Sequence, residues 1–594
     1  MPAPQSPSGV LYLSQGTPNP NGAAAQLYLL SGDPTAAPIH TIQPTPGVNL
    51  PPPLEKPADS LSRLKVLHFN DLHGHVSYFT PYGHRPIFSR IAFRIQELRR
   101  QCQQNPNWAA LVLSGGDDLV GSVFDELLGN ASDSYVAHVS YRLYSQAGVD
   151  AAVIGNHDLD WGIHTLARAI RQDARFPVLA ANLVTQSELS GLYYPAAIFV
   201  IQGVRVGIIG LTTPAEIRVQ KDGAFSIADP ILTVHNLLPA LRPLCDVAII
   251  LSHLGRSLDA HSAVVRGAGD VELAQSLPHG SVNLIVGWHT HQALNEHGLA
   301  PDNIVNGIPI VQAGTLGRFV GEITLTLRGQ PDVTHARLTE TENLPVDPAF
   351  EEAYVQPFLE KIQPYFHQKL GPVANHPDLT TEAIRNDFAT GESALANFIT
   401  DAMVARCREH GYPVDFAMLD DSCLRIGLPI GQELTFADWF NMMPFADTIE
   451  LCRITGQQLA ELLQDNACRV DRPGEPHTER GFAQFSRQVR YTIRLKGGIC
   501  EACAEDILLN GIPLQQQLEK SFWVACTSFF RELSGSWEER ARAEVQLMAF
   551  DHADPACEPT ELLLRNEMIA YIRQHGGVTE AAGAVRDGRV QVIT

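Results

Sequence analysis

Histidine, aspartate and asparagine residues gather in five short groups along the first half of the chain. In sequence order the groups are Asp71-Leu72-His73, Gly115-Gly116-Asp117, Gly155-Asn156-His157-Asp158-Leu159-Asp160, Ser252-His253 and Gly287-Trp288-His289-Thr290-His291. Neutral imidazole nitrogens and carboxylate or amide oxygens are donors with which proteins hold divalent cations. A pair of such cations, roughly 3.5–4 Å apart, can clamp the attacking and the leaving oxygen of an ester during hydrolysis. The five groups therefore predict a two-metal hydrolytic centre.

Spacing within two of the groups favours ligation of one ion by two side chains. One residue separates Asp71 from His73, and one residue separates His289 from His291. In an extended segment, alternate side chains project to the same side, so each pair is expected to reach a single cation. Either pair alone is common in surface turns, whereas five such groups in this order indicate a metal site.

The elements that must position these groups are short apolar runs, one before each group. They cover residues 64–69, 109–113, 151–154, 246–251 and 282–286, and a further run covers residues 204–210. Stretches at residues 87–102 and 134–147 predict helices between these runs. Short buried strands that alternate with helices are typical of an α/β layered domain. Ligands of such folds bind beyond the carboxyl ends of the strands, which is where all five groups lie.

The rest of the sequence divides into an N-terminal extension, a connector and a second domain. Residues 1–62 are rich in proline and favour a β-hairpin followed by an extended linker, because two apolar runs flank Asn19-Pro20-Asn21-Gly22. Residues 63–345 hold the five groups, and residues 346–372 predict a helical connector. Residues 373–594 predict a separate α+β domain. Its expected helices are residues 394–408 and 457–466, and its expected strands are residues 489–495 and 522–527.

Composition limits the classes of partner. The chain has 594 residues, with 43 Lys and Arg against 65 Asp and Glu, which gives a net charge of −22. This acidic balance argues against a nucleic acid polymer as partner. No apolar run reaches the roughly 18–20 residues of a membrane-spanning helix, so no membrane partner is expected. Ten scattered cysteines, including the lone pair Cys500 and Cys503, indicate mostly reduced thiols rather than a disulfide framework or a zinc ribbon.

The first residues of the chain bear on its location. No Lys or Arg precedes Lys56, so the basic segment that begins an export signal is missing. We therefore expect a cytoplasmic protein. A periplasmic or extracellular location is the alternative, if the start site is misassigned.

The five groups, in this order and spacing, resemble the signature blocks of the calcineurin-like metallophosphoesterases, and most closely the 5'-nucleotidase/UDP-sugar hydrolase branch. The resemblance covers residues 63–345 strongly. It continues into the second domain at residues 395–398, 443–445 and 480–482. It implies a four-layer α/β/β/α sandwich followed by a second α+β domain that resembles the 5'-nucleotidase C-terminal domain and determines substrate specificity.

The resemblance also implies a role for each residue of the five groups. Asp71, His73 and His291 would hold a first metal ion, Asp117 would bridge two ions, and Asn156, His253 and His289 would complete the second site. His157 would be the catalytic histidine, oriented by Asp160. The implied reaction is hydrolysis of a phosphate ester by a metal-bridging hydroxide, with a His-Asp dyad. The donor set suits two divalent ions among Mn, Zn, Fe and Co without distinguishing them.

The second domain leaves the substrate open. In the resembled branch this domain binds the nucleoside, and the matching positions here are Arg425, Phe445 and Phe529, of which the two aromatics would stack on a base. Asp420-Asp421-Ser422-Cys423-Leu424 replaces an asparagine and glycine loop of that branch, which changes the loop's shape. A small phosphorylated metabolite, with a nucleotide favoured, is the expected substrate. The alternatives are a cyclic-nucleotide phosphodiesterase, a sugar phosphatase, or a non-catalytic metal-dependent binding protein, which would not need His157 with Asp160. The sequence does not indicate the oligomeric state.

Overall fold

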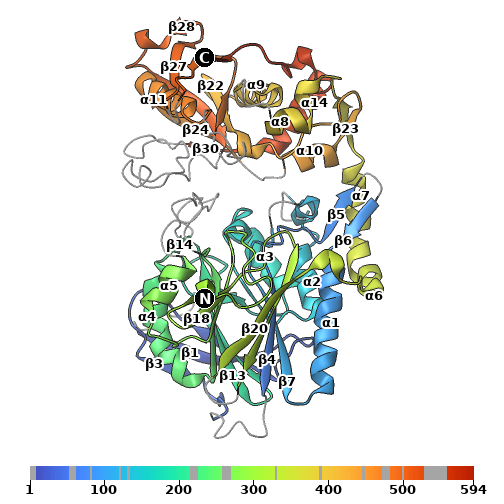
Figure 1. The fold of residues 1–594 in the computed structure, drawn as a ribbon, viewed down its shortest axis with the longest axis vertical. Coiled ribbons are helices and arrows are strands. Elements are labelled where there is room, and N and C mark those ends of the chain that lie inside the picture. Colours follow the sequence, from blue (N-terminus) through green and yellow to red (C-terminus); the bar gives the residue numbers. More distant parts are fainter. Residues whose placement is uncertain are drawn as a thin grey trace. The chain divides into compact units, whose positions relative to one another are not determined.

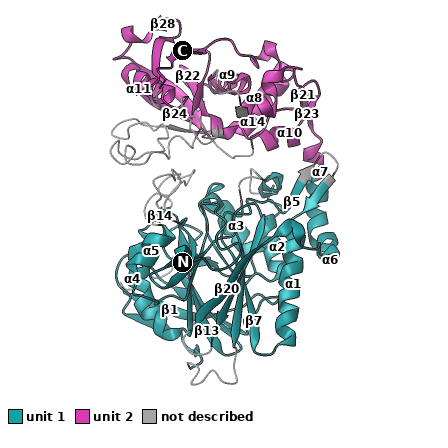
Figure 2. Cartoon of the chain, viewed as in Figure 1, with its two compact units in different colours: residues 1–362 teal, residues 363–594 magenta. Residues whose placement is uncertain are grey.

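The computed structural model describes residues 9–52, 62–80, 83–119, 122–129, 134–213, 225–256, 269–327, 331–386, 391–443, 448–470, 482–497, 501–527 and 558–594. The chain divides into a first unit of residues 1–362 and a second unit of residues 363–594 (Figure 2). The border between the units lies inside helix α7 (Gln356–Phe366).

One sheet of the first unit has nine strands, and it includes the N-terminal segment. In spatial order they are β17 (Ile304–Val305), β18 (Ile308–Val311), β16 (Leu284–Gly287), β15 (Val247–His253), β13 (Val204–Thr212), β12 (Ala196–Ile201), β2 (Gln26–Ser31), β1 (Val10–Gly16) and β3 (Thr41–Pro44). β1 and β2 pair antiparallel, and β2 also pairs with β12. The N-terminal segment is thus part of the sheet that leads into two of the five groups.

The other large sheet of the first unit has seven strands. In spatial order they are β11 (Tyr193–Tyr194), β9 (Val178–Leu179), β8 (Ala151–Val153), β7 (Trp108–Ser114), β4 (Arg63–Phe69), β19 (Phe319–Thr326) and β20 (Asp332–Glu340). β4, β7 and β8 run parallel, whereas β19 runs antiparallel to β4. The described residues of this unit also form two short strand pairs: β5 (Ser77–Thr80) with β6 (Gly83–Pro86), and β10 (Leu183–Thr185) with β14 (Phe225–Ile227).

Helices cover the outer faces of the two sheets, which gives four layers (Figure 1). They are α1 (Phe88–Gln104), α2 (Val139–Ala147) and α3 (Gly162–Asp173) on one side, and α4 (Pro230–Leu241) and α5 (Asp270–Ser276) on the other. Successive residues of β12 alternate between two apolar cores: Phe199 and Ile201 pack between the sheets, whereas Ile198 and Val200 pack toward α4 and α5. This period of two explains why the strand is apolar throughout, because both of its faces are buried.

Two of the expected helices differ from the observed ones. The helix expected at residues 134–147 begins only at Val139, because the side chain of His138 caps it by accepting the N–H of Tyr141 at 3.2 Å. The connector is built from α6 (Pro348–Phe350), a π turn (Glu351–Val355) and α7. After α7 the chain enters strand β21 (Lys369–Pro372), so the helical part ends earlier than the expected connector.

The second unit is a mixed α and β structure. Its five-stranded sheet contains β25 (Ala483–Phe485), β22 (Phe416–Asp420), β29 (Ser521–Thr527), β24 (Thr448–Thr455) and β30 (Glu558–Leu563). Its four-stranded sheet contains β28 (Ile512–Pro513), β27 (Cys503–Leu509), β26 (Val489–Arg494) and β31 (Val590–Ile593), and β21 pairs with β23 (Glu433–Thr435). The helices among its described residues are α8 (Thr381–Asn386), α9 (Ala394–Glu409), α10 (Phe436–Met442), α11 (Gly456–Ala467) and α14 (Leu564–His575).

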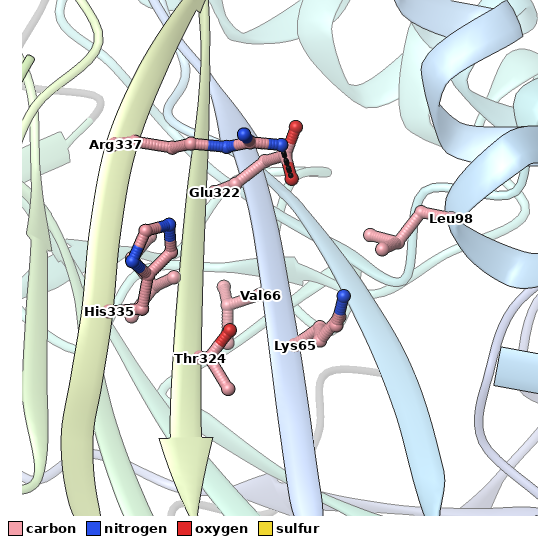
Figure 3. Close-up of a pocket in the computed structure, with 8 residues that line it drawn as sticks. Lys65, Val66, Leu98, Glu322, Thr324, His335 and Arg337 are labelled. Carbon is pink, nitrogen blue, oxygen red and sulfur yellow. Dashed lines mark hydrogen bonds and ion pairs between the residues drawn. The ribbon is translucent and has the colours of Figure 1, made fainter. Parts of the chain in front are cut away.

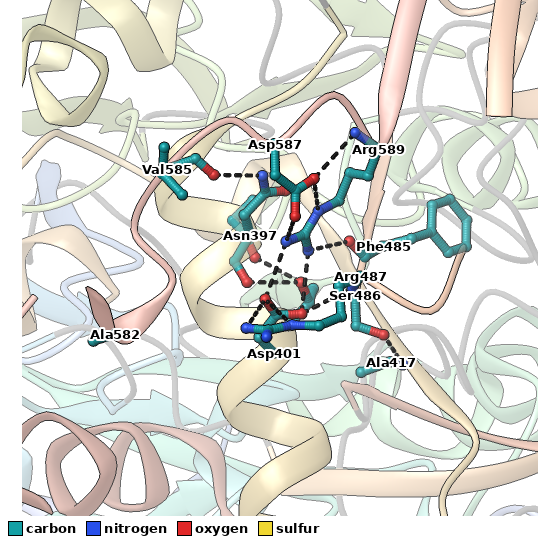
Figure 4. A network of polar contacts seen from close by, with 12 residues as sticks. Asn397, Asp401, Ala417, Phe485, Ser486, Arg487, Ala582, Val585, Asp587 and Arg589 are labelled. Carbon is teal, nitrogen blue, oxygen red and sulfur yellow. Dashed lines mark hydrogen bonds and ion pairs between the residues drawn. The ribbon is translucent and has the colours of Figure 1, made fainter. Parts of the chain in front are cut away.

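A buried ion-pair network joins α9 to β31 in the second unit (Figure 4). The carboxylate of Asp401 accepts from both terminal nitrogens of Arg589, at 3.2 and 3.0 Å, and from the backbone and side chain of Arg487. The side chains of Arg589 and Asp401 are only 2% and 3% exposed. Asp587 pairs with Arg589 as well, and this contact outweighs the effect of burial and lowers the pKa of the Asp587 carboxyl. The network fixes the last strand of the chain to the central helix.

Replacement of Arg589 by methionine should destabilise the second unit by about 1–3 kcal/mol, because it removes the buried partner of Asp401 and leaves that carboxylate paired with Arg487 alone. Native-state hydrogen exchange of the α9 amides in the full chain measures this loss. Arg494→Met is the matched control: Arg494 pairs with Glu505 at 2.8 Å, but both side chains are more than a third exposed. That change should cost less than about 1 kcal/mol. Equal losses in the two variants would contradict the importance of the buried network.

Most of the described cysteines are reduced. Seven described cysteines carry free thiols, and Cys452 is disulfide-bonded. The expectation of mostly reduced thiols therefore agrees with the described cysteines, among which Cys452 is the exception. Cys503 of the CxxC pair is a free thiol, whereas Cys500 lies outside the described residues.

Among the helices of the described residues, none is both long and apolar enough to cross a membrane.

Candidate metal centre

The five groups follow strands that end at the same edge of each sheet. β4, β7 and β8 are parallel neighbours, and their carboxyl ends lead into Asp71, Asp117 and Asn156. β15 and β16 are parallel neighbours in the other sheet; β15 ends at His253, and His289 follows β16 by two residues. Because the two sheets pack face to face over one apolar core, side chains from both edges come together.

Three sets of side chains among the described residues lie close enough to hold a cation. They are Asp71 with His73 and His291, His73 with Asp117 and His157, and Asp117 with His253 and His289. Within each set the potential ligand atoms lie within 4.8 Å of one another. Asp117 belongs to two sets, and its Oδ2 lies 3.0 Å from Nε2 of His253. A carboxylate shared in this way can link two neighbouring cation positions.

Further distances connect the sets into one site. Nε2 of His253 and Nε2 of His291 each lie 3.9 Å from Oδ1 of Asp71. Nε2 of His73 lies 3.3 Å from Nε2 of His291. Asn156 is fully buried next to His157, whose backbone N–H donates to Oδ1 of Asp117 at 2.9 Å. The structure thus brings the seven residues predicted as metal ligands to one place.

Five of the seven candidate ligands have left-handed backbone. The angle φ is +45° at Asp71, +47° at His73, +50° at Asp117, +71° at His289 and +55° at His291. This conformation costs a residue with a side chain roughly 1–3 kcal/mol and persists only where the surroundings enforce it. The expectation that the paired ligands project from extended segments is therefore wrong. The chain turns sharply at each ligand instead, and such strain gathered in one place indicates a functional site.

Backbone carbonyls orient two of the histidines. Nδ1 of His253 lies 2.6 Å from the carbonyl oxygen of Gly115, and Nδ1 of His73 lies 3.1 Å from that of Leu119. Because a carbonyl can only accept, Nδ1 carries the proton in both rings and Nε2 is left as the donor atom for a cation. Both rings are buried, so their orientation is fixed before any ion arrives.

The protonation states of His73 and Asp117 and the hydrogen bonding of Asp71 fit a site for divalent cations. Burial lowers the pKa of His73 well below its usual value, which keeps the ring neutral. Burial would raise the pKa of Asp117, but His253 and His157 hold it well below its usual range. Oδ1 of Asp71 is buried and accepts no hydrogen bond. An anionic carboxylate and an oxygen without a hydrogen-bond donor, both enclosed by imidazole nitrogens, match the needs of a metal centre.

His157 and Asp160 form a dyad beside these ligands. Nδ1 of His157 lies 2.7 Å from Oδ2 of Asp160, and the two side chains are 12% and 2% exposed. The three-residue spacing crosses a 3-10 turn (His157–Leu159), which brings the two side chains together. The carboxylate fixes the orientation of the ring, and one ring nitrogen lies within 4.8 Å of the potential ligand atoms of Asp117 and His73. The arrangement can deliver or hold a proton next to the cation positions.

Two family models match the chain: calcineurin-like phosphoesterase over residues 64–293 and the 5'-nucleotidase C-terminal domain over residues 372–537. The chain belongs to the calcineurin-like phosphoesterases, in the 5'-nucleotidase branch. It is therefore a metal-dependent phosphoric ester hydrolase, and the expected family and fold class are confirmed.

This phosphoesterase is similar in sequence to a known 5'-nucleotidase and similar in fold to two solved structures. It is similar to the 5'-nucleotidase of Vibrio cholerae, with 27% identity over 466 residues that cover 72% of this chain and 79% of the relative. Its fold is similar to that of a 5'-nucleotidase precursor from Thermus thermophilus, with a TM-score of 0.58, 22% identity and coverage of 90% and 99%. It is also similar to that of the sulfate thiohydrolase SoxB from the same organism, with a TM-score of 0.53, 17% identity and coverage of 92% and 98%. Proteins with this fold thus carry names of different activities, so the fold alone does not decide the substrate.

The predicted substrate residues of the phosphoesterase are only partly described. Arg425 lies exposed on the second unit, after the 3-10 turn Asp421–Cys423, and its N–H donates to the carbonyl of Met442. Phe445 and Phe529 lie outside the described residues. In the loop before Arg425, burial and the neighbouring charge of Asp420 raise the pKa of Asp421 to about 8. The replaced loop therefore contains a buried carboxyl group whose ionisation is disfavoured.

Two residues near the phosphoesterase site were not identified from the sequence pattern. The carboxylate of Asp158 accepts three backbone N–H groups, from Gly155 at 2.8 Å, Asp118 at 2.9 Å and Asp117 at 3.1 Å. It thereby joins the loop after β7 to the loop after β8. Asn70 donates to Oδ2 of Asp71 at 2.8 Å and accepts the N–H of Ala313 at 3.1 Å. Their sequence signal is a short polar residue directly beside a predicted ligand or catalytic residue, in a loop whose buried N–H groups need acceptors.

A cavity of about 220 Å³ lies elsewhere in the first unit, against α1, β4, β19 and β20 (Figure 3). Its lining includes Lys65, Glu322, Thr324, His335 and Arg337. Figure 3 shows Arg337 reaching across to Glu322, and Glu322 also receives two 2.6 Å hydrogen bonds from Arg94. None of the predicted site residues lines this cavity. It is therefore not the site of the hydrolytic chemistry.

Proposed function

We propose that this phosphoesterase hydrolyses the phosphate ester of a small metabolite, with a 5'-nucleotide as the favoured substrate. The observation that carries the reaction is the position of Asp117, which is shared between two sets of potential ligands, with the dyad of His157 and Asp160 beside it. The nucleotide is supported by the order of the two domains and by the relatives named as 5'-nucleotidases.

The proposed centre holds two divalent cations. Asp71, His73 and His291 would bind the first, His253, His289 and Asn156 the second, and Asp117 both. When bound, the cations lower the pKa of a coordinated water molecule and neutralise charge on the phosphoryl group. The buried carboxylates and the carbonyl-oriented rings keep the donor atoms in place during this chemistry.

His157 is proposed to act on the leaving oxygen. Asp160 binds Nδ1 of His157, so Nε2 is the atom available to the substrate. A proton delivered from Nε2 would neutralise charge on the oxygen that departs, and the paired carboxylate stabilises the ring while it is positively charged.

A substrate panel tests the proposal. The purified full chain with Mn²⁺ should hydrolyse 5'-mononucleotides with a higher kcat/KM than cyclic nucleotides or sugar phosphates. Released inorganic phosphate is the measurement. Preference for a cyclic nucleotide or a sugar phosphate would overturn the nucleotide assignment alone. Failure to hydrolyse any phosphate ester with any of Mn²⁺, Zn²⁺, Co²⁺ or Fe²⁺ would overturn the proposed reaction.

Removal of metal ions should abolish this activity reversibly. Dialysis against a chelator is expected to lower the rate of phosphate release by at least about a thousand-fold, because bound cations lower the activation free energy by several kcal/mol. Addition of Mn²⁺ or another divalent ion should restore it. Elemental analysis of the reconstituted protein should give two ions per chain. Full activity in metal-free protein would contradict the proposed centre.

A further inference from the structure

His289 lies at the centre of a strained three-residue turn. The N–H of Thr290 donates to the carbonyl of Trp288 at 2.9 Å, and φ of His289 is +71°. A hydrogen bond between residues i and i+2 around a positive central φ defines the rare, strained form of the γ-turn. His289 is only 4% exposed, so its ring has little room to reorient. The backbone of the turn therefore determines the direction in which the ring points. Neighbouring groups must hold the turn in place.

The side chain of Gln312 contacts both ends of this turn. Its Nε2 donates to the carbonyl of Trp288 at 3.3 Å, and its Oε1 accepts from Oγ1 of Thr290 at 3.2 Å. Gln312 is fully buried and comes from the segment directly after β18, outside the five groups. Oγ1 of Thr290 also accepts the N–H of Arg256 at 3.2 Å. The residues before and after His289 are thus held by one amide side chain.

The same buried region reaches the other histidine of this set. Oδ1 of Asp270, the first residue of α5, lies 2.5 Å from the hydroxyl of Ser252, which donates to it and directly precedes His253. A Cβ atom at Gly287 would clash with Oδ2 of Asp270 and would lie 3.2 Å from Nε2 of Gln312. The absence of a side chain at position 287 therefore lets the carboxyl of Asp270 and the amide of Gln312 approach each other beneath the turn.

We infer that Gln312 is a positioning residue for the second cation site, acting through the γ-turn of His289. The inference rests on the proposed role of His253 and His289 as metal ligands. Gln312 neither binds the ion nor touches the substrate. It holds the strained backbone in the one conformation that aims the His289 ring toward Asp117 and His253. Loss of its two hydrogen bonds should release the turn and weaken the second site more than the first, because His289 is the centre of the turn whereas His291 lies one residue beyond it.

Two variants of the full chain separate this role from simple folding. Gln312→Met keeps a similar volume and removes both polar contacts. Thr290→Val removes only the hydroxyl, and Thr290→Ser keeps it as the conservative control. Co²⁺ titration followed by visible absorption reports the affinity and the coordination geometry of each site. Thermal unfolding of the metal-free proteins measures how much each substitution destabilises the fold.

For Gln312→Met, Co²⁺ affinity at one site should fall about 10–100-fold, the range typical of groups that orient metal ligands. The other site should lose less affinity. Thr290→Val should show a smaller loss at the same site, and Thr290→Ser should restore both affinity and spectrum. Unchanged Co²⁺ affinity and spectrum in both Gln312→Met and Thr290→Val would overturn the inference. If the unchanged protein itself binds fewer than two ions, the proposed two-metal centre fails instead, and this inference with it.

Discussion

Replacement of Asp117 by alanine is expected to lower kcat/KM for a 5'-mononucleotide by at least about a thousand-fold. Asp117 is the only residue common to the set with His73 and His157 and the set with His253 and His289 among the described residues. Its loss removes the shared anion, so the cations lose a ligand and repel each other more strongly. Bound cations lower the activation free energy by several kcal/mol, and each 1.36 kcal/mol corresponds to about a tenfold change in rate.

Metal content distinguishes this effect from unfolding. Elemental analysis of Asp117→Ala should give fewer than two ions per chain, while its far-ultraviolet circular dichroism matches that of the unchanged protein. Asp33→Ala serves as the control, because Asp33 is exposed and far from the site in sequence. That control should retain both ions and full activity. Two tightly held ions and normal turnover in Asp117→Ala would refute the bridging role.

Replacement of His157 by glutamine is expected to lower kcat by about 10²–10⁴-fold, the usual contribution of a positioned acid or base, with both ions retained. His157 is placed to donate to the leaving oxygen rather than to bind a cation. The loss should therefore be much smaller for an aryl phosphate, whose leaving group departs without a proton. Steady-state kinetics with a nucleotide and an aryl phosphate measure the difference directly.

The dyad offers a graded comparison. Asp160→Asn keeps the shape of its side chain but not the charge, so it should cost about 10–100-fold in kcat. His164→Gln is the matched histidine control, because the His164 side chain is 81% exposed and pairs with Glu188. It should leave kcat unchanged for both substrates. An equal loss for nucleotide and aryl phosphate in His157→Gln would rule out proton delivery to the leaving group.

Much of the site was predictable because two independent patterns coincide. Apolar runs identify the parallel strands, and polar groups such as Gly155-Asn156-His157-Asp158 mark where those strands end. Parallel strands place their carboxyl ends at one edge, so the groups had to converge. The prediction of which side chains converge needed no knowledge of the loop geometry.

The backbone of the ligand loops was not predictable in the same way. Asp71 and His289 carry side chains, and a sequence gives little sign that such residues adopt a left-handed conformation without glycine. The conformation is imposed by distant contacts, such as that of Gln312 with the turn at His289, and these contacts exist only after folding. The contribution of residues 10–44 to the nine-stranded sheet was hidden for a similar reason, because it depends on the pairing of β2 with β12.

The left-handed ligand loops have a consequence for how the protein acquires metal. Asp158, the carbonyl of Gly115 and the buried packing of the two sheets hold the donor atoms through contacts that involve no ion. The ordering of the site is therefore completed when the chain folds, unlike in small zinc modules, whose folding requires the metal. One divalent ion should then replace another by simple exchange in the folded protein. The ion present in a given cell would reflect supply as much as affinity.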